Sequence, residues 1–382
     1  MRYRRLGRTG LQVSEIGFGA EWMGKPQEEV DAFVRACEET GINLMDVWMA
    51  DPAMRSKLGH AMAERGTRDQ WIIQGHIGST WQDGQYVRTR ELDQVRPAFE
   101  DLLARLHTDH VELGMIHYVD ACDEFRAIMN GPFIAYVREL LAAGKIGHVG
   151  LSTHNPEVAL LACDEPEIEV VMFSLNPAFD MLPASEDIND LFGDYENVAG
   201  DGIEPVRARL YAKAEQTETA LTVMKGYAGG RLLSADASPF GVALTPVQCI
   251  HYALTRPAVA SVMVGVETVE QLEEALAYGD ATAAERDYAS VLAAAPKHAY
   301  LGQCTYCGHC APCAVGINIA LSNKFADLAE MAGEVPASVA AHYKAMDVTA
   351  GACIACGDCE PRCPFDVPII ERMEKTEELF GC

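Results

Sequence analysis

Short apolar runs alternate with longer amphipathic stretches from the start of the chain to about residue 280. The apolar runs have the length of buried strands, and they predict strands at residues 16–20, 42–45, 71–74, 111–115, 146–150, 170–173, 220–224 and 259–264. The stretches between them carry apolar residues at helical spacing, and they predict helices at residues 28–39, 89–105, 124–143, 204–214, 246–255 and 269–278. Strands that alternate with helices in this order are typical of βαβ units and a parallel sheet.

The number of these repeats favours one α/β architecture. Eight strand–helix units within roughly 250–280 residues match the size of a (β/α)8 TIM barrel. A doubly wound sheet is the alternative, yet neither G-x-G-x-x-G after the first strand nor a Walker loop is present. We therefore expect a barrel domain over residues 1–297 and a small second domain over residues 298–382. Helical spacing of apolar residues at 317–347 predicts that the second domain is helix-rich.

One loop of the predicted barrel is unusually long. Residues 177–202 follow the sixth strand and contain Asp, Gly and Pro. Loops of this length in compact domains are usually lids or binding elements, with a solvated insertion as the alternative. The loop lies at the barrel end where active sites are found.

Composition narrows the class of protein. The 382 residues are 49% hydrophobic, but no run approaches the roughly 18 apolar residues of a membrane span. The N-terminus has basic residues without an apolar segment behind them, so we expect no signal peptide and a reducing, cytoplasmic location. A formal net charge of −26 makes nucleic acid an improbable partner, because phosphate binding needs a basic patch.

Eight of the thirteen cysteines form two tight runs near the C-terminus. The second run has the C-x2-C-x2-C-x3-C-P spacing of two-cluster ferredoxins, in which the fourth cysteine ligates the other cluster. The first run has two residues instead of three before its last cysteine and no following proline. Exchange of the fourth ligands predicts two [4Fe–4S] sites: Cys304, Cys307, Cys310 and Cys363 for one, and Cys353, Cys356, Cys359 and Cys313 for the other.

Two other uses of these cysteines are less consistent with the spacing. A zinc ribbon needs two C-x2-C pairs separated by a longer stretch. Disulfides belong mainly to small secreted domains. With four thiolates for each cluster, both clusters are expected to carry electrons rather than to bind substrate at an open iron.

The chain resembles the aldo-keto reductases that carry a C-terminal ferredoxin module. The resemblance rests on the opening segment 3–14, on Gly41-Ile-Asn-Leu-Met-Asp46, on Gly147-His-Val-Gly-Leu-Ser152, on segment 223–233 and on the cysteine runs, all in the same order. It covers essentially the whole chain. It implies a (β/α)8 barrel followed by a helical ferredoxin domain with two clusters.

The resemblance also implies where catalytic residues belong. The family uses Asp, Tyr, Lys and His at the C-terminal ends of the second, third and fourth strands, and Asp46 and His117 occupy the Asp and His positions. The Tyr position holds Asp51 and the Lys position holds His76. We therefore take Asp46, His117, His76 and Asp51 as candidate catalytic residues.

The nucleotide site implied by the family is altered in this chain. Met224 replaces an aromatic residue that stacks on nicotinamide, and Met172 replaces a Gln that holds the carboxamide. Ala275 replaces an Asn near the adenine, and Glu267 would repel a 2′-phosphate. If NAD(P)H binds, the residues expected around it are Ser152, Asn176, Lys225 and Gly265.

Three functions remain open from the sequence. The first is an anaerobic oxidoreductase that passes electrons from the clusters, supplied by a redox partner such as ferredoxin, to a small-molecule substrate. His117 would donate the proton and Asp46 would orient or charge it. The second is an NAD(P)H-dependent carbonyl reductase with a rebuilt acid. The third is a non-catalytic electron-transfer or scaffold protein. Histidines and carboxylates at the barrel mouth also suggest a less favoured Fe(II) or Zn(II) site.

Overall fold

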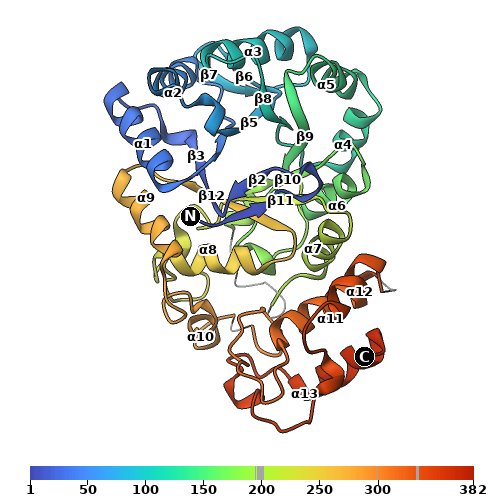
Figure 1. Ribbon diagram of the computed structural model, residues 1–382. Coiled ribbons are helices and arrows are strands. Elements are labelled where there is room, and N and C mark those ends of the chain that lie inside the picture. The colour runs from blue at the N-terminus through green and yellow to red at the C-terminus, as the bar shows by residue number, and fades with distance from the viewer. Residues whose placement is uncertain (194, 196–201, 299, 333–334) are drawn as a thin grey trace.

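The computed structural model of the chain describes residues 1–193, 195, 202–298, 300–332 and 335–382. Eight strands form a closed, fully parallel barrel in the order β10-β11-β12-β3-β4-β5-β8-β9 (Figure 1). They are β3 (Ile16–Gly19), β4 (Leu44–Val47), β5 (Ile72–Ile77), β8 (Val111–Ile116), β9 (Ile146–Thr153), β10 (Val170–Ser174), β11 (Ala220–Met224) and β12 (Val259–Gly265). The predicted TIM barrel is confirmed, and each of these strands overlaps one of the predicted apolar runs.

Two antiparallel hairpins are added to the barrel. The first joins β1 (Tyr3–Arg5) to β2 (Gln12–Ser14). The second, β6 (Ser79–Gln82) with β7 (Gln85–Arg88), follows β5 and was not predicted. Its turn is Asp83-Gly84, and φ is 49° at Asp83 and 79° at Gly84. Two successive positive φ values match a type I′ turn, for which Asp-Gly is a preferred sequence.

Helices surround the barrel in Figure 1, as the amphipathic pattern predicts. They are α1 (Gln27–Thr40), α2 (Pro52–Arg65), α3 (Leu92–Arg105), α4 (Cys122–Met129), α5 (Pro132–Ala142), α6 (Pro156–Asp164), α7 (Pro205–Gln216), α8 (Pro246–Thr255), α9 (Val269–Leu276) and α10 (Tyr288–Ala293). The single helix expected at 124–143 is wrong. Two helices, α4 and α5, occur there because Gly131-Pro132 interrupts the stretch. Proline disrupts the interior of a helix but is tolerated in its first turn, so Pro132 begins a new helix, α5. Helices α2 and α6 were not predicted.

The barrel interior is filled by apolar side chains below the mouth. Leu44, Leu113, Met115 and Val170 belong to one buried cluster, which also includes Leu6 and Val13 from the N-terminal hairpin segment. The candidate residues lie at the opposite end of the barrel strands.

The C-terminal region is helical, as expected. It contains α11 (Ile319–Ala332), α12 (Ala337–Lys344) and α13 (Ile369–Phe380), which lie beside one end of the barrel region in Figure 1. Helix α11 packs against α7 of the barrel and against α13. An ion pair between Arg372 and Asp327 joins α13 to α11, and Tyr343 stacks on Phe380 with ring centroids 4.0 Å apart.

The long loop predicted at 177–202 is only partly described, since residues 194 and 196–201 lie outside the described residues. Its first part is buried and includes a short 3-10 helix, Phe179–Met181. A second 3-10 helix, Ile188–Phe192, brings Ile188 to the cavity described below. Its role as a lid stays a prediction.

Candidate active site and cysteine hollows

A cavity of about 490 Å³ opens at the C-terminal ends of the barrel strands. Aromatic side chains form much of its wall: Trp22, Trp48, Tyr86, Tyr118 and Tyr227. Asp46, His76, His117 and His154 supply polar groups to the same cavity. Its volume and its mixture of apolar walls with a few polar groups suit a small organic molecule.

The candidate catalytic residues Asp46, His76 and His117 are brought together. Asp46 is in β4, His76 is in β5 and His117 directly follows β8, so three neighbouring strands supply them. Nε2 of His76 lies 2.8 Å from Oδ1 of Asp46, and Nδ1 of His76 lies 2.8 Å from Nδ1 of His117. All three side chains are almost fully buried.

Gln74 supports this cluster from the same strand as His76. Residues two positions apart in a strand point to the same face, so both side chains reach the barrel interior. The Gln74 amide donates to Oδ1 of Asp46 at 2.8 Å and accepts from the hydroxyl of Thr222 at 3.0 Å. Asp46 is thus held by hydrogen bonds although it lies among apolar neighbours.

Tyr86 extends the cluster to the cavity and was missed in the sequence. Its hydroxyl oxygen lies 2.6 Å from Nε2 of His117, and the residue comes from β7 of the unpredicted hairpin. Trp48 stacks on the His117 ring at 6.0 Å and meets the Tyr86 ring edge-on at 5.4 Å. The Asp-Gly turn between β-prone residues is the sequence signal that would have indicated the hairpin.

The surroundings keep both His117 and Tyr86 in their neutral forms. Burial, with the nearby His76 and Arg90, lowers the pKa of His117 well below its usual value. Burial raises the pKa of Tyr86 to about 12. Nη2 of Arg90 donates to the main-chain oxygen of His117 at 2.7 Å, which fixes the backbone there.

Asp51 is not part of this cluster. Its carboxylate accepts hydrogen bonds from the main-chain N–H groups of Ala53, at 2.7 Å, and Met54, at 3.2 Å. It is therefore the N-cap of α2, with Pro52 in the first turn, a combination typical of helix starts. The interpretation of Asp51 as a catalytic residue is replaced by this capping role, because its side chain is directed to the helix end.

The expected nucleotide-binding residues separate into two groups. Ser152, Lys225 and Gly265 line the cavity. Asn176 does not: its side chain accepts from the N–H groups of Ala178 and Phe179, each at 2.9 Å, and donates to the main-chain oxygen of Lys225. Asn176 therefore organises the loop after β10.

A second buried histidine–carboxylate pair was also missed. Asp120 Oδ2 lies 2.9 Å from Nδ1 of His154, and Asp120 Oδ1 accepts from the main-chain N–H of His154 at 2.7 Å. The Tyr118 ring lies edge-on to His154 at 5.0 Å. His154, like Ser152, belongs to the cavity wall, so the histidine of this pair can meet a bound substrate.

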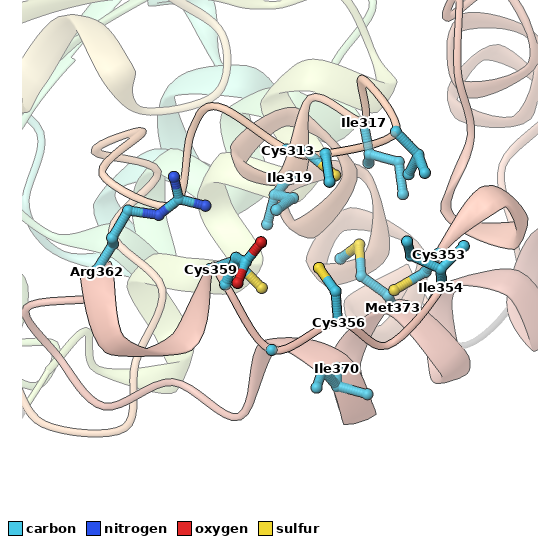
Figure 2. Close-up of a pocket in the computed structure, with 14 residues that line it drawn as sticks. Cys313, Ile317, Ile319, Cys353, Ile354, Cys356, Cys359, Arg362, Ile370 and Met373 are labelled. Carbon is cyan, nitrogen blue, oxygen red and sulfur yellow. The ribbon is translucent and has the colours of Figure 1, made fainter.

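The cysteines of the C-terminal region surround two hollows. Figure 2 shows the first, toward which Cys313, Cys353, Cys356 and Cys359 converge among isoleucines and Met373. The second is lined by Cys304, Cys307, Cys310 and Cys363, with apolar residues that include Phe365 and Val367. Each set contains three cysteines from one run and one from the other. The donor chemistry of four thiols with apolar walls fits a [4Fe–4S] cubane.

The geometry does not support a single metal ion at the barrel mouth. Across the part of the chain that the structure describes, no three His, Cys, Asp or Glu side chains are grouped as around one metal ion. Both ring nitrogens of His76 are already engaged, with Asp46 and with His117. His76 therefore has no free ring nitrogen with which to bind a single iron or zinc ion.

Buried contacts connect the second hollow to the barrel. The Tyr288 hydroxyl donates to the main-chain oxygen of Thr305 at 2.7 Å, and Arg256 donates to the same oxygen. Thr305 directly follows Cys304. The Arg256 guanidinium also lies over the ring of Tyr252, 4.4 Å from its centroid.

The same contacts continue to the barrel mouth. The Tyr252 hydroxyl donates to Oδ2 of the buried Asp180 at 2.7 Å. Tyr300 donates to the main-chain oxygen of Pro177, the residue after Asn176 in the loop that follows β10. Asn176 in turn donates to the oxygen of Lys225, a residue of the cavity wall.

Comparison with known proteins is consistent with this geometry. The sequence model of the aldo/keto reductase family matches residues 15–295. The chain belongs to the aldo/keto reductase family. A second family model, the 4Fe-4S dicluster domain, matches residues 303–368. The protein is therefore an iron–sulfur oxidoreductase of the aldo-keto reductase type, and the family resemblance inferred from the sequence is confirmed.

Individual relatives cover the barrel portion. The uncharacterized oxidoreductase YqkF of Bacillus subtilis is 27% identical over 293 residues, which span 72% of this chain and 90% of that protein. Aldo-keto reductase YhdN of the same organism is 29% identical over 168 residues, 41% of this chain and 48% of its own length. Aldo-keto reductase AKR11C1 from Bacillus halodurans, in its holo form, superimposes with a TM-score of 0.59 at 21% identity, covering 75% of this chain and 94% of its own, and supports the fold. Among the described residues, no helix is long and apolar enough to span a bilayer.

Proposed function

We propose that this aldo/keto reductase transfers electrons through two [4Fe–4S] clusters to a small organic substrate in the barrel-mouth cavity. The substrate class is a carbonyl compound, an enone or a hydroxylated compound that is reduced with loss of water. The observation that carries the proposal is the series of buried contacts from Thr305, next to Cys304, through Tyr288, Arg256, Tyr252 and Tyr300 to the loop after β10. Such contacts give electrons a route through packed protein instead of solvent.

The proposed clusters use the crossed sets of ligands. One cluster takes Cys304, Cys307, Cys310 and Cys363, and the other takes Cys353, Cys356, Cys359 and Cys313. The loop that would hold the first cluster contacts Arg256 and Tyr288, so the electron-transfer chemistry that this cluster would supply lies next to the barrel. The cysteines of the second set would hold a cluster accessible to a redox partner such as ferredoxin, since Cys356 is exposed. A reducing cytoplasm is the compartment in which such thiolates and clusters persist.

Protons would come from the cluster of Asp46, His76 and His117. His117 is the proposed source of the proton, and it lines the cavity. Because the His117 ring is neutral, it needs a neighbour that can supply a proton. His76, which is paired with Asp46, contacts His117. A positioned acid of this kind typically contributes 10²–10⁴-fold to the rate.

An NAD(P)H-dependent carbonyl reduction is the second candidate, and Tyr86 is the observation that favours it. Tyr86 lines the cavity and could replace the proton-donating tyrosine of the family, whose position holds Asp51 in this chain. Ser152, Lys225 and Gly265 remain in the cavity wall for a nucleotide. Met172 and Met224 line the same cavity and cannot provide the carboxamide hydrogen bonds or aromatic stacking of the family pattern, which places this candidate second.

Cluster reoxidation tests the first proposal directly. Protein reduced anaerobically with dithionite, and then freed of excess reductant, is mixed in stopped flow with 2-cyclohexenone or 9,10-phenanthrenequinone. We expect the visible cluster absorption to return on the order of 10² times faster in the wild type than in His117→Ala of equal iron content. Equal rates in the two proteins would show that electrons do not reach these compounds through the barrel mouth.

A further inference from the structure

Four side chains form a continuous line of hydrogen bonds from the cavity into the barrel. The distances are 2.6 Å from the Tyr86 oxygen to Nε2 of His117, 2.8 Å between the two Nδ1 atoms of His117 and His76, and 2.8 Å from Nε2 of His76 to Oδ1 of Asp46. Tyr86 is partly exposed and lines the cavity, whereas Asp46, His76 and His117 are buried. The other three side chains also line the cavity, but the tyrosine is the one most accessible to a substrate.

The contact between the two histidines restricts where hydrogens can be. Two imidazole Nδ1 atoms at 2.8 Å can share one hydrogen, and two hydrogens would repel each other. If that hydrogen is on His117, its Nε2 has none and accepts from Tyr86. His76 then carries its hydrogen on Nε2 and donates to the Asp46 carboxylate. Every hydrogen bond in the line is satisfied in this arrangement.

One additional proton reverses part of the line. His76 then carries hydrogens on both nitrogens, donates through Nδ1 to His117, and remains paired with the Asp46 carboxylate. His117 carries its hydrogen on Nε2 and donates to the Tyr86 oxygen, so the Tyr86 hydroxyl hydrogen points into the cavity. Again every hydrogen bond is satisfied, and the two arrangements differ by one proton.

We propose that Tyr86 is the catalytic acid–base residue and that His117, His76 and Asp46 form a one-proton relay behind it. In reduction, the Tyr86 O–H bond breaks as the proton moves to the oxygen of a carbonyl that has accepted an electron. Tyr86 takes the Nε2 hydrogen of His117, and His117 takes the Nδ1 hydrogen of His76. His76 ends neutral with its Nε2 hydrogen on Asp46, which is the first arrangement described above.

The charges around the line place the extra proton at one point in it. His117 faces Arg88 at the end of β7, Arg90 just after it, His154 just after β9 and His76 from β5. A positive charge on His117 is therefore unfavourable. His76 instead contacts the Asp46 carboxylate, which also accepts from Gln74. A proton added to His76 would lie against that carboxylate, whereas one added to His117 would face cationic side chains. The relay therefore holds its proton on His76 and delivers it to the substrate through Tyr86, which contacts His117.

The relay deepens the proposed function, since it supplies protons to the same cavity, but it can be tested without substrate or electrons. The holoprotein is labelled with ¹⁵N-histidine, and long-range ¹H–¹⁵N NMR is recorded across a pH titration. We expect His76 as the Nε2–H form and His117 as the Nδ1–H form at high pH. Protonation of His76 should then change His117 to the Nε2–H form in the same titration step.

Two variants make the result specific. Tyr86→Phe keeps the ring but removes the acceptor that the Nε2–H form of His117 requires, so the linked change of the His117 tautomer should be lost. Tyr118→Phe is the matched control, because that tyrosine also lies edge-on to His117, at 6.2 Å, and this variant should keep the linked change of the His117 tautomer. The relay is refuted if His117 keeps one tautomer while His76 titrates, or if both variants behave alike.

The outcomes separate the relay from the electron path. A linked change at His76 and His117, with equal reoxidation rates in the stopped-flow comparison, would retain the relay and reject electron delivery to the cavity. Independent titration of the two histidines, with rates that depend on His117, would reject the relay and retain the proposed function.

Discussion

The hydroxyl of Tyr288 donates a hydrogen bond of 2.7 Å to the main-chain oxygen of Thr305, the residue after Cys304. Tyr288 begins α10, and Thr305 belongs to the first cysteine run. Arg256, at the end of α8, donates to the same oxygen. The loop that holds the proposed inner cluster is therefore anchored on the side of the barrel by two buried side chains.

This anchor predicts the effect of changing Arg256. Arg256→Met should lower the free energy of unfolding by about 1.5–3 kcal/mol, the usual contribution of a hydrogen bond to a charged group. It should also speed the release of iron to a chelator, because the loop after Cys304 loses a fixed point. Thermal unfolding and chelator-trapped iron measure the two effects.

The matched control is Arg35→Met, which removes an exposed arginine of α1 far from the cysteines in sequence. It should change the unfolding midpoint and the iron release little, as surface substitutions usually do. Similar iron release in the two variants would contradict the anchoring role of Arg256.

The cluster stoichiometry is the second prediction. Anaerobically purified protein should contain about eight irons and eight acid-labile sulfides per chain, as two cubanes require. Dithionite should bleach the visible band and produce interacting EPR signals from two reduced clusters. Four irons per chain at full occupancy, or stoichiometric zinc, would contradict the assignment.

The crossed ligands can be tested within the same measurement. Cys313→Ser should disturb the cluster formed with Cys353, Cys356 and Cys359, and Cys363→Ser should disturb the cluster formed with the first run. Cys122→Ser is the control, since Cys122 begins α4 in the barrel. Loss of the cluster belonging to the variant cysteine's own run would contradict the crossing.

The fold was largely predictable because its main signals are local. Each barrel strand is a short apolar run between polar stretches, and cysteine spacing indicated a cluster domain. Helix α2 was missed because its buried residues include Arg55 and Gly59, which interrupt an apolar stripe. Asp51 was misread for a related reason: the family pattern placed it in the active site, whereas the following Pro52 makes it a helix cap.

The site was predictable only in part because it depends on long-range contacts. Asp46 and His117 could be predicted as site residues because they lie at the C-terminal ends of strands, and these ends meet at one edge of a parallel barrel. Tyr86 belongs to no barrel strand and reaches His117 only because the Asp83-Gly84 turn folds β7 back over the barrel mouth. The pairing of His154 with Asp120 likewise depends on contacts 34 residues apart.

Weak nucleotide binding is the third prediction. NADPH should bind poorly and reduce simple aldehydes slowly, because Met224 and Met172 stand where the family pattern has a stacking aromatic residue and an amide. Fluorescence titration with NADPH and NADH measures the affinity. Glu267→Ala should strengthen the binding of NADPH more than the binding of NADH, if repulsion between Glu267 and the 2′-phosphate contributes to the affinity. Sub-micromolar affinity with rapid aldehyde turnover would instead support the nicotinamide-dependent candidate.

The fourth prediction concerns proton supply during turnover. His117→Ala should lower the rate of cluster-driven reduction by at least about 10²-fold, the usual contribution of a positioned acid. Tyr86→Phe should cause a loss of the same order, because both residues pass the same proton. Asp46→Asn should also lower the rate, since a neutral side chain no longer offsets the charge of a proton carried by His76. Reduced methyl viologen as electron donor and 9,10-phenanthrenequinone as acceptor provide the assay.

The iron content of these three variants decides how a loss is interpreted. Asp46, Tyr86 and His117 line the barrel-mouth cavity, whereas the cysteines surround separate hollows, so iron and sulfide should stay at the wild-type level. A rate that falls with unchanged clusters places the chemistry at the barrel mouth. If all three variants keep both the wild-type rate and intact clusters, the cavity takes no part in the reaction, and a non-catalytic electron-transfer protein becomes the better description of this chain.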